Sequence, residues 1–90
     1  MLRRSLRIHP EDSVMCVLED AHKGDTVETP EGEKIVLLED IEFGHKVAIK
    51  DLKKGEPVIK YGEEIGYMLT AAPKGTWIHM HNMGCDRGKI

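Results

Sequence analysis

The sequence has few aromatic residues, only two cysteines, no long hydrophobic run and no strong excess of either charge. Two cysteines, Cys16 and Cys85, are too few for a disulfide framework, and we expect both to be reduced. No apolar run approaches the roughly 20 residues of a membrane span, and the arginine-rich start lacks the apolar centre of a secretory signal. The net charge of −3, with both signs interleaved, argues against nucleic-acid binding. These absences favour a cytoplasmic protein that acts on neither membranes nor nucleic acids.

The composition that remains predicts one small all-β domain spanning 1–90. A hydrophobic content of 40% suffices for a globular core, although a chain of 90 residues buries only a small one. Nine glycines and four prolines interrupt the chain at short intervals, which favours short strands over helices. At most a single helical turn is expected, at Lys50–Lys54. The expected strands are Leu6–His9, Val14–Leu18, Lys34–Leu38, Lys46–Ala48, Pro57–Ile59, Glu64–Met68 and Trp77–His81.

A Lys-Gly pair followed by a polar residue occurs at Gly24, Gly55 and Gly75. Glycine adopts positive φ angles without a steric penalty, so each pair predicts a tight turn into the next strand. The spacings of 31 and 20 residues differ, which excludes a solenoid repeat. The pattern therefore predicts a compact fold of short, strongly bent strands.

The segment His79-Met80-His81 contains two of the five histidines. If it is a strand, both imidazoles share one face and could converge on a metal ion or an anion, with the Asn82 amide beside them. The alternative is a solvent-facing pair with Trp77 packed nearby. Adding Cys85 gives a ligand spacing that matches no closed zinc site.

Two other segments place cationic or titratable side chains at turns. In Gly44-His45-Lys46 an imidazole and an ammonium group project from a corner, which suits proton transfer or a substrate carboxylate. Beside the expected turn at Gly62, Lys60 could bind an anion and the Tyr61 phenol could donate a hydrogen bond. The alternatives are a solvated turn at His45, a surface charge at Lys60, and a Tyr61 ring that caps the core.

Four motifs occur in an order that resembles the N-terminal SAF-type domain of the altronate and galactarate dehydratase family. They are Ile8-His9-x-x-Asp12-x-Val14, Gly44-His45-Lys46-Val47-Ala48, Lys60-Tyr61-Gly62-x-x-Ile65-Gly66-Tyr67 and His79-x-His81-Asn82. The resemblance covers almost the whole chain. The fourth motif is closer to the altronate than to the galactarate branch, and Ile8-His9 and Ile65-Gly66-Tyr67 favour altronate over sulfolactate. The segments Ser13-Val14-Met15-Cys16 and Gly84-Cys85-Asp86-Arg87 depart from the pattern.

The resemblance implies a β-clip fold and a share in the dehydration of a sugar acid, such as altronate, to a 2-keto-3-deoxy acid. It implies a divalent metal such as iron in the assembled enzyme, and a large catalytic dehydratase subunit or region as partner. His45, His79 and His81 are then the expected catalytic residues, with His79 and His81 as candidate metal ligands. Lys46, Lys60, Tyr61 and Asn82 are the expected substrate-binding residues.

Three functions remain open on the sequence alone. The first is a small subunit or N-terminal domain of a sugar-acid hydro-lyase, which would be an enzyme only together with its large part. The second is a non-catalytic module that binds a sugar acid or docks a partner. The third is the small subunit of a sulfolactate sulfo-lyase. The sequence also leaves open whether copies of the domain associate with one another.

Overall fold

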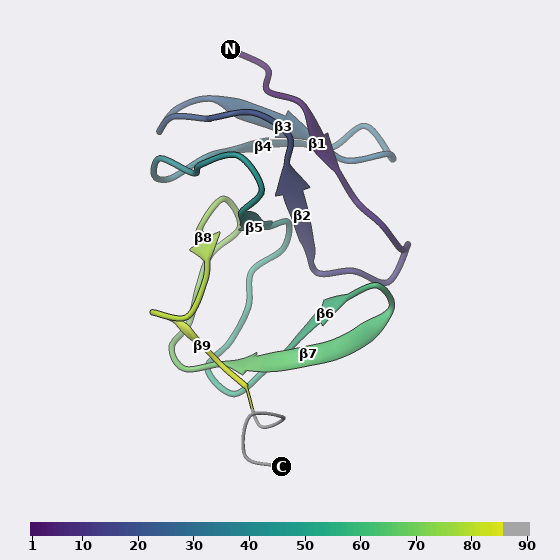
Figure 1. Ribbon diagram of the computed structural model, residues 1–90, viewed down its shortest axis with the longest axis vertical. Coiled ribbons are helices and arrows are strands. Elements are labelled where there is room, and N and C mark those ends of the chain that lie inside the picture. Colours follow the sequence, from purple (N-terminus) through teal and green to yellow (C-terminus); the bar gives the residue numbers. More distant parts are fainter. Residues whose placement is uncertain (86–90) are drawn as a thin grey trace.

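A computed structural model describes residues 1–85 and shows an all-β domain (Figure 1). The described residues form nine short strands and no helix, so none of these residues belongs to a helix that could cross a membrane. The strands are β1 (Ser5–Leu6), β2 (Val14–Val17), β3 (Thr26–Glu28), β4 (Lys34–Val36), β5 (Lys46–Ala48), β6 (Pro57–Lys60), β7 (Glu63–Met68), β8 (Trp77–Ile78) and β9 (Met83–Gly84).

Three small antiparallel sheets build the molecule. The largest has the order β1-β2-β5-β8 and lies between the β3-β4 hairpin and the three-stranded sheet β6-β7-β9. The two outer sheets lie at opposite ends of the molecule's long axis (Figure 1). Successive strands are short and often belong to different sheets, so sharp turns connect most of them. The glycine pattern predicted such turns.

The chain contains an internal repeat with an offset of 31 residues. Gly24 and Gly55 are 31 residues apart, as are Gly44 and Gly75, and all four have positive φ angles between 84° and 95°. Backbone hydrogen bonds repeat with the same offset: Gly24 donates to Leu37 as Gly55 donates to Met68, and Gly44 donates to Val17 as Gly75 donates to Ala48. The Lys-Gly spacing looked irregular because the fourth turn glycine, Gly44, follows phenylalanine instead of lysine.

The core repeats in the same way. Two clusters of buried side chains lie on either side of the central sheet, and six residues of the first have a buried counterpart 31 positions later in the second. Three residues of the first cluster lack a counterpart in the second: Met15 corresponds to Lys46, Ile35 to Gly66, and Ile49 to the exposed Met80. The six pairs are Val17 and Ala48, Ala21 and Leu52, Val27 and Val58, Leu37 and Met68, Ile41 and Ala72, and Val47 and Ile78.

The structure confirms the all-β class and corrects several element boundaries. The first expected strand is limited to Ser5–Leu6, and the segment expected as Trp77–His81 stops at Ile78 and continues as a turn. Thr26–Glu28 and Met83–Gly84 are strands that periodicity missed, because two or three residues carry no alternation. The expected helical turn at Lys50–Lys54 is absent, since Leu52 pairs with Ala72 in an isolated β-bridge.

Candidate functional site

The imidazole of His45 is held by the indole of Trp77. Gly44, with a φ of 87°, turns the chain so that His45 directly precedes β5, and the His45 amide donates to the Glu42 carbonyl. Trp77 Nε1 donates to His45 Nδ1 over 3.0 Å. An Nδ1 atom that accepts a hydrogen bond leaves the proton of the neutral ring on Nε2. The contact therefore presents His45 Nε2–H as a hydrogen-bond donor.

A turn that Asn82 closes positions His79 and His81. Asn82 is 6% exposed; its Oδ1 accepts from the His79 amide over 2.9 Å, and its Nδ2 donates to the Trp77 carbonyl over 2.8 Å. Both polar atoms of the side chain are thus engaged within the turn, and Asn82 orients its neighbours instead of facing a ligand. Because the segment is a turn, the strand argument for placing His79 and His81 on one face does not apply.

Trp77 nevertheless brings three histidines together. Its ring stacks on His79 at a centroid distance of 5.6 Å and meets His81 at 4.7 Å and His45 at 5.5 Å. The rings of His45 and His79 lie 5.0 Å apart. The sequence predicted the histidines as site residues, but Trp77 was expected only to pack beside them. The signal was available, since the chain has one tryptophan and it lies two residues before His79.

The environment of His79 favours its neutral form. Burial lowers the pKa of His79 below its ordinary value, and electrostatic interactions with His45, Lys46 and His81 lower the pKa further. Near pH 7 the ring is therefore a neutral base. A neutral acceptor imidazole and a His45 Nε2–H donor lie side by side, which is the arrangement that a paired proton removal and delivery needs.

Lys46 and Lys60 are two lysines of this face whose side chains interact electrostatically. Among the described residues, no carboxylate lies within 4 Å of either ammonium group. Both side chains are partly buried, and Lys46 pairs with Cys16 across β2 and β5. Burial lowers the pKa of Lys46, the charge of Lys60 lowers it further, and the Cys16 thiol acts in the opposite sense. Such a pair is suited to an anion that supplies the missing charge.

The β6-β7 hairpin carries Lys60 and Tyr61 to this face. A two-residue loop, Tyr61-Gly62, joins the strands, and both residues have positive φ angles of 61° and 72°. The buried Asp12 carboxylate accepts from the Gly62 amide over 2.8 Å and fixes the loop against the start of β2. Lys60 Nζ lies 4.9 Å from the centroid of the Tyr61 ring. Tyr61 is 55% exposed, so it does not cap the core.

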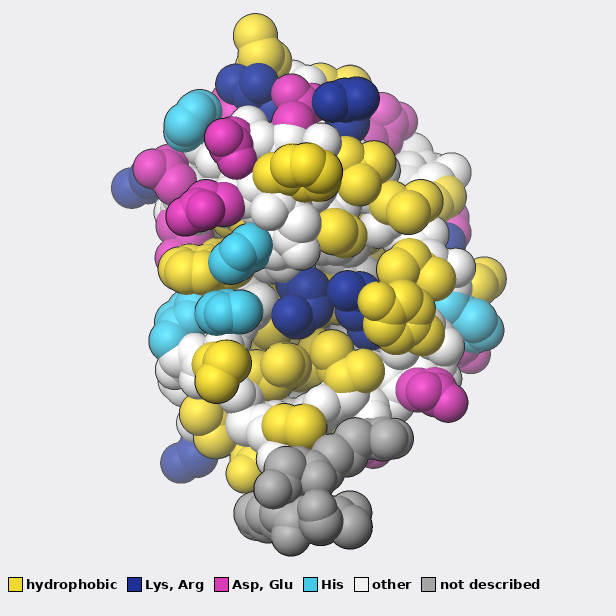
Figure 2. All heavy atoms as spheres, in the orientation of Figure 1, with side chains coloured by type: hydrophobic (Ala, Val, Ile, Leu, Met, Phe, Trp, Pro, Cys, Tyr) yellow, Lys and Arg dark blue, Asp and Glu magenta, His cyan; other side chains and the backbone are white. Residues whose placement is uncertain are grey.

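Figure 2 shows basic side chains in the middle of one face of the molecule, with histidine side chains beside them and hydrophobic side chains around them. The pKa of His79 responds to Lys46, and that of Lys46 to Lys60, so the imidazole cluster and the lysine pair act on one another. We call His45, Lys46, Lys60, Trp77 and His79 the imidazole–lysine face. His81 and Tyr61 lie at its margins, each next to one of its members.

The donor atoms of this face do not make a complete metal site. Within residues 1–85 no group of three or more histidine, cysteine, aspartate or glutamate side chains is placed to hold one ion. From residues 1–85, a metal bound at this face would receive imidazole nitrogens, and it would need further ligands. Cys85 is exposed and Cys16 partly exposed, and both are free thiols.

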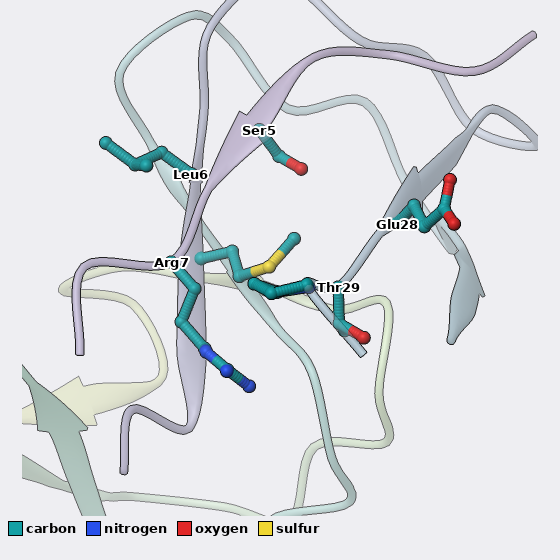
Figure 3. Close-up of a pocket in the computed structure, with 7 residues that line it drawn as sticks. Ser5, Leu6, Arg7, Glu28 and Thr29 are labelled. Carbon is teal, nitrogen blue, oxygen red and sulfur yellow. The ribbon is translucent and has the colours of Figure 1, made fainter. Parts of the chain in front are cut away.

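A separate pocket of about 320 Å³ lies beside β1, where Ser5, Leu6, Arg7, Glu28 and Thr29 line it (Figure 3). Arg7 is the basic group of this pocket, but its guanidinium already forms two hydrogen bonds with the Glu31 carboxylate. An anion entering the pocket would have to compete with that pair. The imidazole–lysine face is therefore the better candidate for a ligand that carries negative charge.

The fold and this face define a small all-β domain that presents clustered imidazoles next to two lysines with no carboxylate partner among the described residues. The sequence profile of the family "Altronate/galactarate dehydratase SAF domain" matches residues 3–86. The chain belongs to this family.

Individual relatives give the same result over most of the chain. Altronate dehydratase of Escherichia coli (strain K12) is 39% identical over 77 residues, which are 86% of this chain and 15% of that protein. Altronate dehydratase of Bacillus subtilis (strain 168) is 33% identical over 81 residues, 90% of this chain and 16% of that protein. The (2R)-sulfolactate sulfo-lyase subunit alpha of Paracoccus pantotrophus is 56% identical over 54 residues, 60% of this chain and 81% of that subunit. The chain thus spans about a sixth of the length of the altronate dehydratases.

Proposed function

We propose that this chain is the small part of a sugar-acid hydro-lyase that acts on altronate together with a large catalytic part. The observation that carries the proposal is the imidazole–lysine face, where the His45 and His79 rings lie 5.0 Å apart beside two lysines that no carboxylate of the described residues approaches. The family membership and the altronate dehydratases among the relatives support the choice of reaction.

The reaction removes water from a polyhydroxy carboxylate. A base takes the proton from the carbon next to the carboxylate, and an acid protonates the hydroxyl that leaves the following carbon. The resulting enol gains a proton on carbon and becomes the 2-keto-3-deoxy acid. In this scheme His79 is the base, because its neutral form prevails near pH 7, and His45 Nε2–H assists the departing hydroxyl. His81 at the margin of the cluster remains a candidate for proton transfer.

Lys46 and Lys60 would hold the substrate carboxylate, with the exposed Tyr61 phenol available to a hydroxyl group. Two ammonium groups next to a carboxylate also stabilise the negative charge that develops on it when the neighbouring proton leaves. A divalent metal, expected from the resemblance, would polarise the substrate oxygens, and the large part would have to supply most of its ligands. Asn82 acts here as a positioning residue for the His79 turn.

The test is reconstitution of the 90-residue chain with the large dehydratase chain from the same source. We expect altronate dehydration to require both chains, and His79→Ala with His81→Ala to reduce kcat/KM by about a hundredfold or more, as loss of a general base typically does. The matched control is His22→Ala, an exposed histidine of another turn. His45→Gln should lower turnover without changing the melting temperature. Undiminished activity in the large chain alone, or in the folded double variant, would overturn the proposal.

The pH profile gives a second measurement. Because the pKa of His79 is lowered, kcat/KM should fall on the acid side with a midpoint below about 6.5, the ordinary value of a histidine. Above that midpoint His79 is neutral and the base is available. An acid limb that persists unchanged in His79→Ala would assign the titration to a group other than His79.

Sulfolactate elimination is the second candidate. The sulfo-lyase subunit alpha of Paracoccus pantotrophus is 56% identical to this chain and is matched over 81% of its own length. A substrate panel of altronate, galactarate and (2R)-sulfolactate on the reconstituted complex separates the two. Turnover of sulfolactate alone would favour the second candidate. Altronate binding by the isolated chain, measured by calorimetry, without any turnover in the complex would indicate a binding module.

A further inference from the structure

Lys46 occupies a position that the internal repeat reserves for a buried apolar side chain. Its counterpart 31 residues earlier is Met15, which is 2% exposed in the first core cluster. The strand registers agree, since Met15 pairs with Val47 as Lys46 pairs with Ile78. The stem of Lys46 therefore extends from a core-equivalent site, and its ammonium group is partly withdrawn from solvent.

The groups around Lys46 do not compensate its charge. Lys60 is the charged side chain that lowers the pKa of Lys46 the most, Cys16 lies opposite across the strand pair, and no described carboxylate is within ion-pair distance. A lysine that is partly desolvated and next to a second cation holds its proton less tightly than an exposed lysine, so at a given pH a larger fraction of its amine is neutral and nucleophilic. The other ammonium group, on Lys60, remains available to an anion.

We propose that Lys46 is a covalent capture site for small carbonyl compounds that carry an anionic group, with Lys60 holding the anion and Lys46 forming an imine with the carbonyl carbon. The neutral Nζ attacks that carbon, and the carbonyl π electrons move to oxygen. Transfer of a proton from nitrogen to this oxygen gives a carbinolamine. Expulsion of water then forms the C=N bond, and we assign the proton transfers to His79, which interacts electrostatically with Lys46. The net change is amine plus carbonyl to imine plus water.

This capture uses residues that the proposed hydro-lyase site also uses, but its test requires neither the large chain nor any dehydratase activity. The 90-residue chain is incubated at pH 7 with glyoxylate, an aldehyde that carries a carboxylate, or with acetaldehyde, its neutral counterpart. Sodium cyanoborohydride reduces each imine to a stable secondary amine. Peptide mass spectrometry then measures the rate of modification at each lysine.

With glyoxylate we expect Lys46 to react on the order of tenfold faster than the exposed lysines, because a larger fraction of its amine is neutral. The ratio of glyoxylate to acetaldehyde rates at Lys46 should fall severalfold in Lys60→Met, and Lys34→Met, which removes an exposed lysine of β4, should leave the ratio unchanged. This ratio reports anion binding alone. Loss of the Lys60 charge changes the neutral fraction of the Lys46 amine, and this change affects the rates with both aldehydes equally.

Lys46→Met should abolish the fast adduct and keep the fold, because methionine is the residue at the repeat-related position. Circular dichroism melting verifies that each variant is folded. Equal glyoxylate rates at Lys46 and at the exposed lysines of the wild-type chain would overturn the capture site, whether or not any variant folds. A rate ratio that is unchanged in folded Lys60→Met would overturn the role of Lys60.

Discussion

At the scale of single residues, Lys46 is the clearest case of a charged side chain at a position where the internal repeat has a buried apolar one. The related position in the first half holds Met15, whose side chain is almost completely buried. Placing an amine there costs solvation of its charge and forgoes apolar contacts. Such local losses of stability are typical of functional positions, where side chains are selected for chemistry instead of packing.

Replacing this lysine should therefore stabilise the domain. We expect Lys46→Met to raise the free energy of unfolding by about 1 kcal/mol, because apolar area replaces a partly desolvated charge next to Lys60. Urea denaturation of the 90-residue chain measures the change, with Lys34→Met as control for loss of a solvated lysine. A Lys46→Met chain that is less stable than wild type would contradict the repeat-based interpretation of this position.

At the scale of elements, the repeat explains how the turns are braced. Three aspartates at related positions accept hydrogen bonds from turn amides: Asp20 from Phe43, Asp40 from Lys23, and Asp51 from Lys74, each over 2.9 Å. The repeat places Ala71 at the fourth position, opposite the amide of Lys54. The fourth turn is thus the one of the set that lacks its side-chain acceptor.

Restoring that acceptor should add stability. We expect Ala71→Asp to increase the free energy of unfolding by about 1 kcal/mol, the usual net contribution of one hydrogen bond. Thr70→Asp, at the neighbouring exposed position, introduces the same charge without the geometry. Equal effects of the two substitutions in urea denaturation would show that charge, and not the hydrogen bond to Lys54, is responsible.

The start of the chain is held to β3 by an ionic contact with a defined pH dependence. Arg3 Nε donates to Asp25 over 2.8 Å, and the His22 amide donates to the same carboxylate over 2.9 Å. The Arg3 hydrogen bond, followed by that from His22, lowers the pKa of Asp25 to about 2. Because the folded-state pKa is below the ordinary 3.8, the contribution to stability is complete above about pH 4 and is lost as the pH falls toward 2.

Asp25→Asn should remove this pH dependence. The melting temperature of the variant should be lower than that of wild type at pH 6, and the difference should shrink between about pH 4 and pH 2, where the wild-type carboxylate is protonated. Glu63→Gln, an exposed carboxylate of β7, serves as control. A difference between Asp25→Asn and wild type that stays constant across this range would assign the acid sensitivity to other groups.

At the scale of the whole molecule, Gly75 joins segments that are distant in the sequence. It lies at the turn before β8 with a φ of 95°, and an added Cβ atom would collide with the Val36 carbonyl oxygen at the end of β4. Its own carbonyl accepts from the Leu38 amide over 3.0 Å. Gly24 has almost the same φ, 91°, but a Cβ atom there would meet nothing within 4 Å.

The two glycines separate backbone strain from packing. Gly24→Ala should cost about 1 kcal/mol of unfolding free energy, the strain of a side chain at positive φ. Gly75→Ala should cost roughly 2 kcal/mol more, because the clash forces β4 and β8 apart. Comparable losses in thermal or urea unfolding would show that the contact between the Gly75 turn and β4 relaxes easily.

The sequence by itself determined the all-β class, the turns at Gly24, Gly55 and Gly75, and the family. It did so because turn glycines, strand alternation and ordered motifs are local features, and each is defined by a few neighbouring residues. The 31-residue repeat is also present in the sequence, but Gly44 follows phenylalanine and the related core residues differ in type, so a search for Lys-Gly pairs does not reveal it.

Only the tertiary structure decided how the site is assembled. His45 and His79 are 34 positions apart, and Trp77 brings their rings together through a hydrogen bond and a stacking contact that no spacing rule predicts. The segment His79–Asn82 is a turn because the Asn82 amide hydrogen-bonds its own backbone neighbours, which overrides the strand pattern. Within residues 1–85 no carboxylate lies within ion-pair distance of Lys46, and this depends on contacts between segments far apart in the chain.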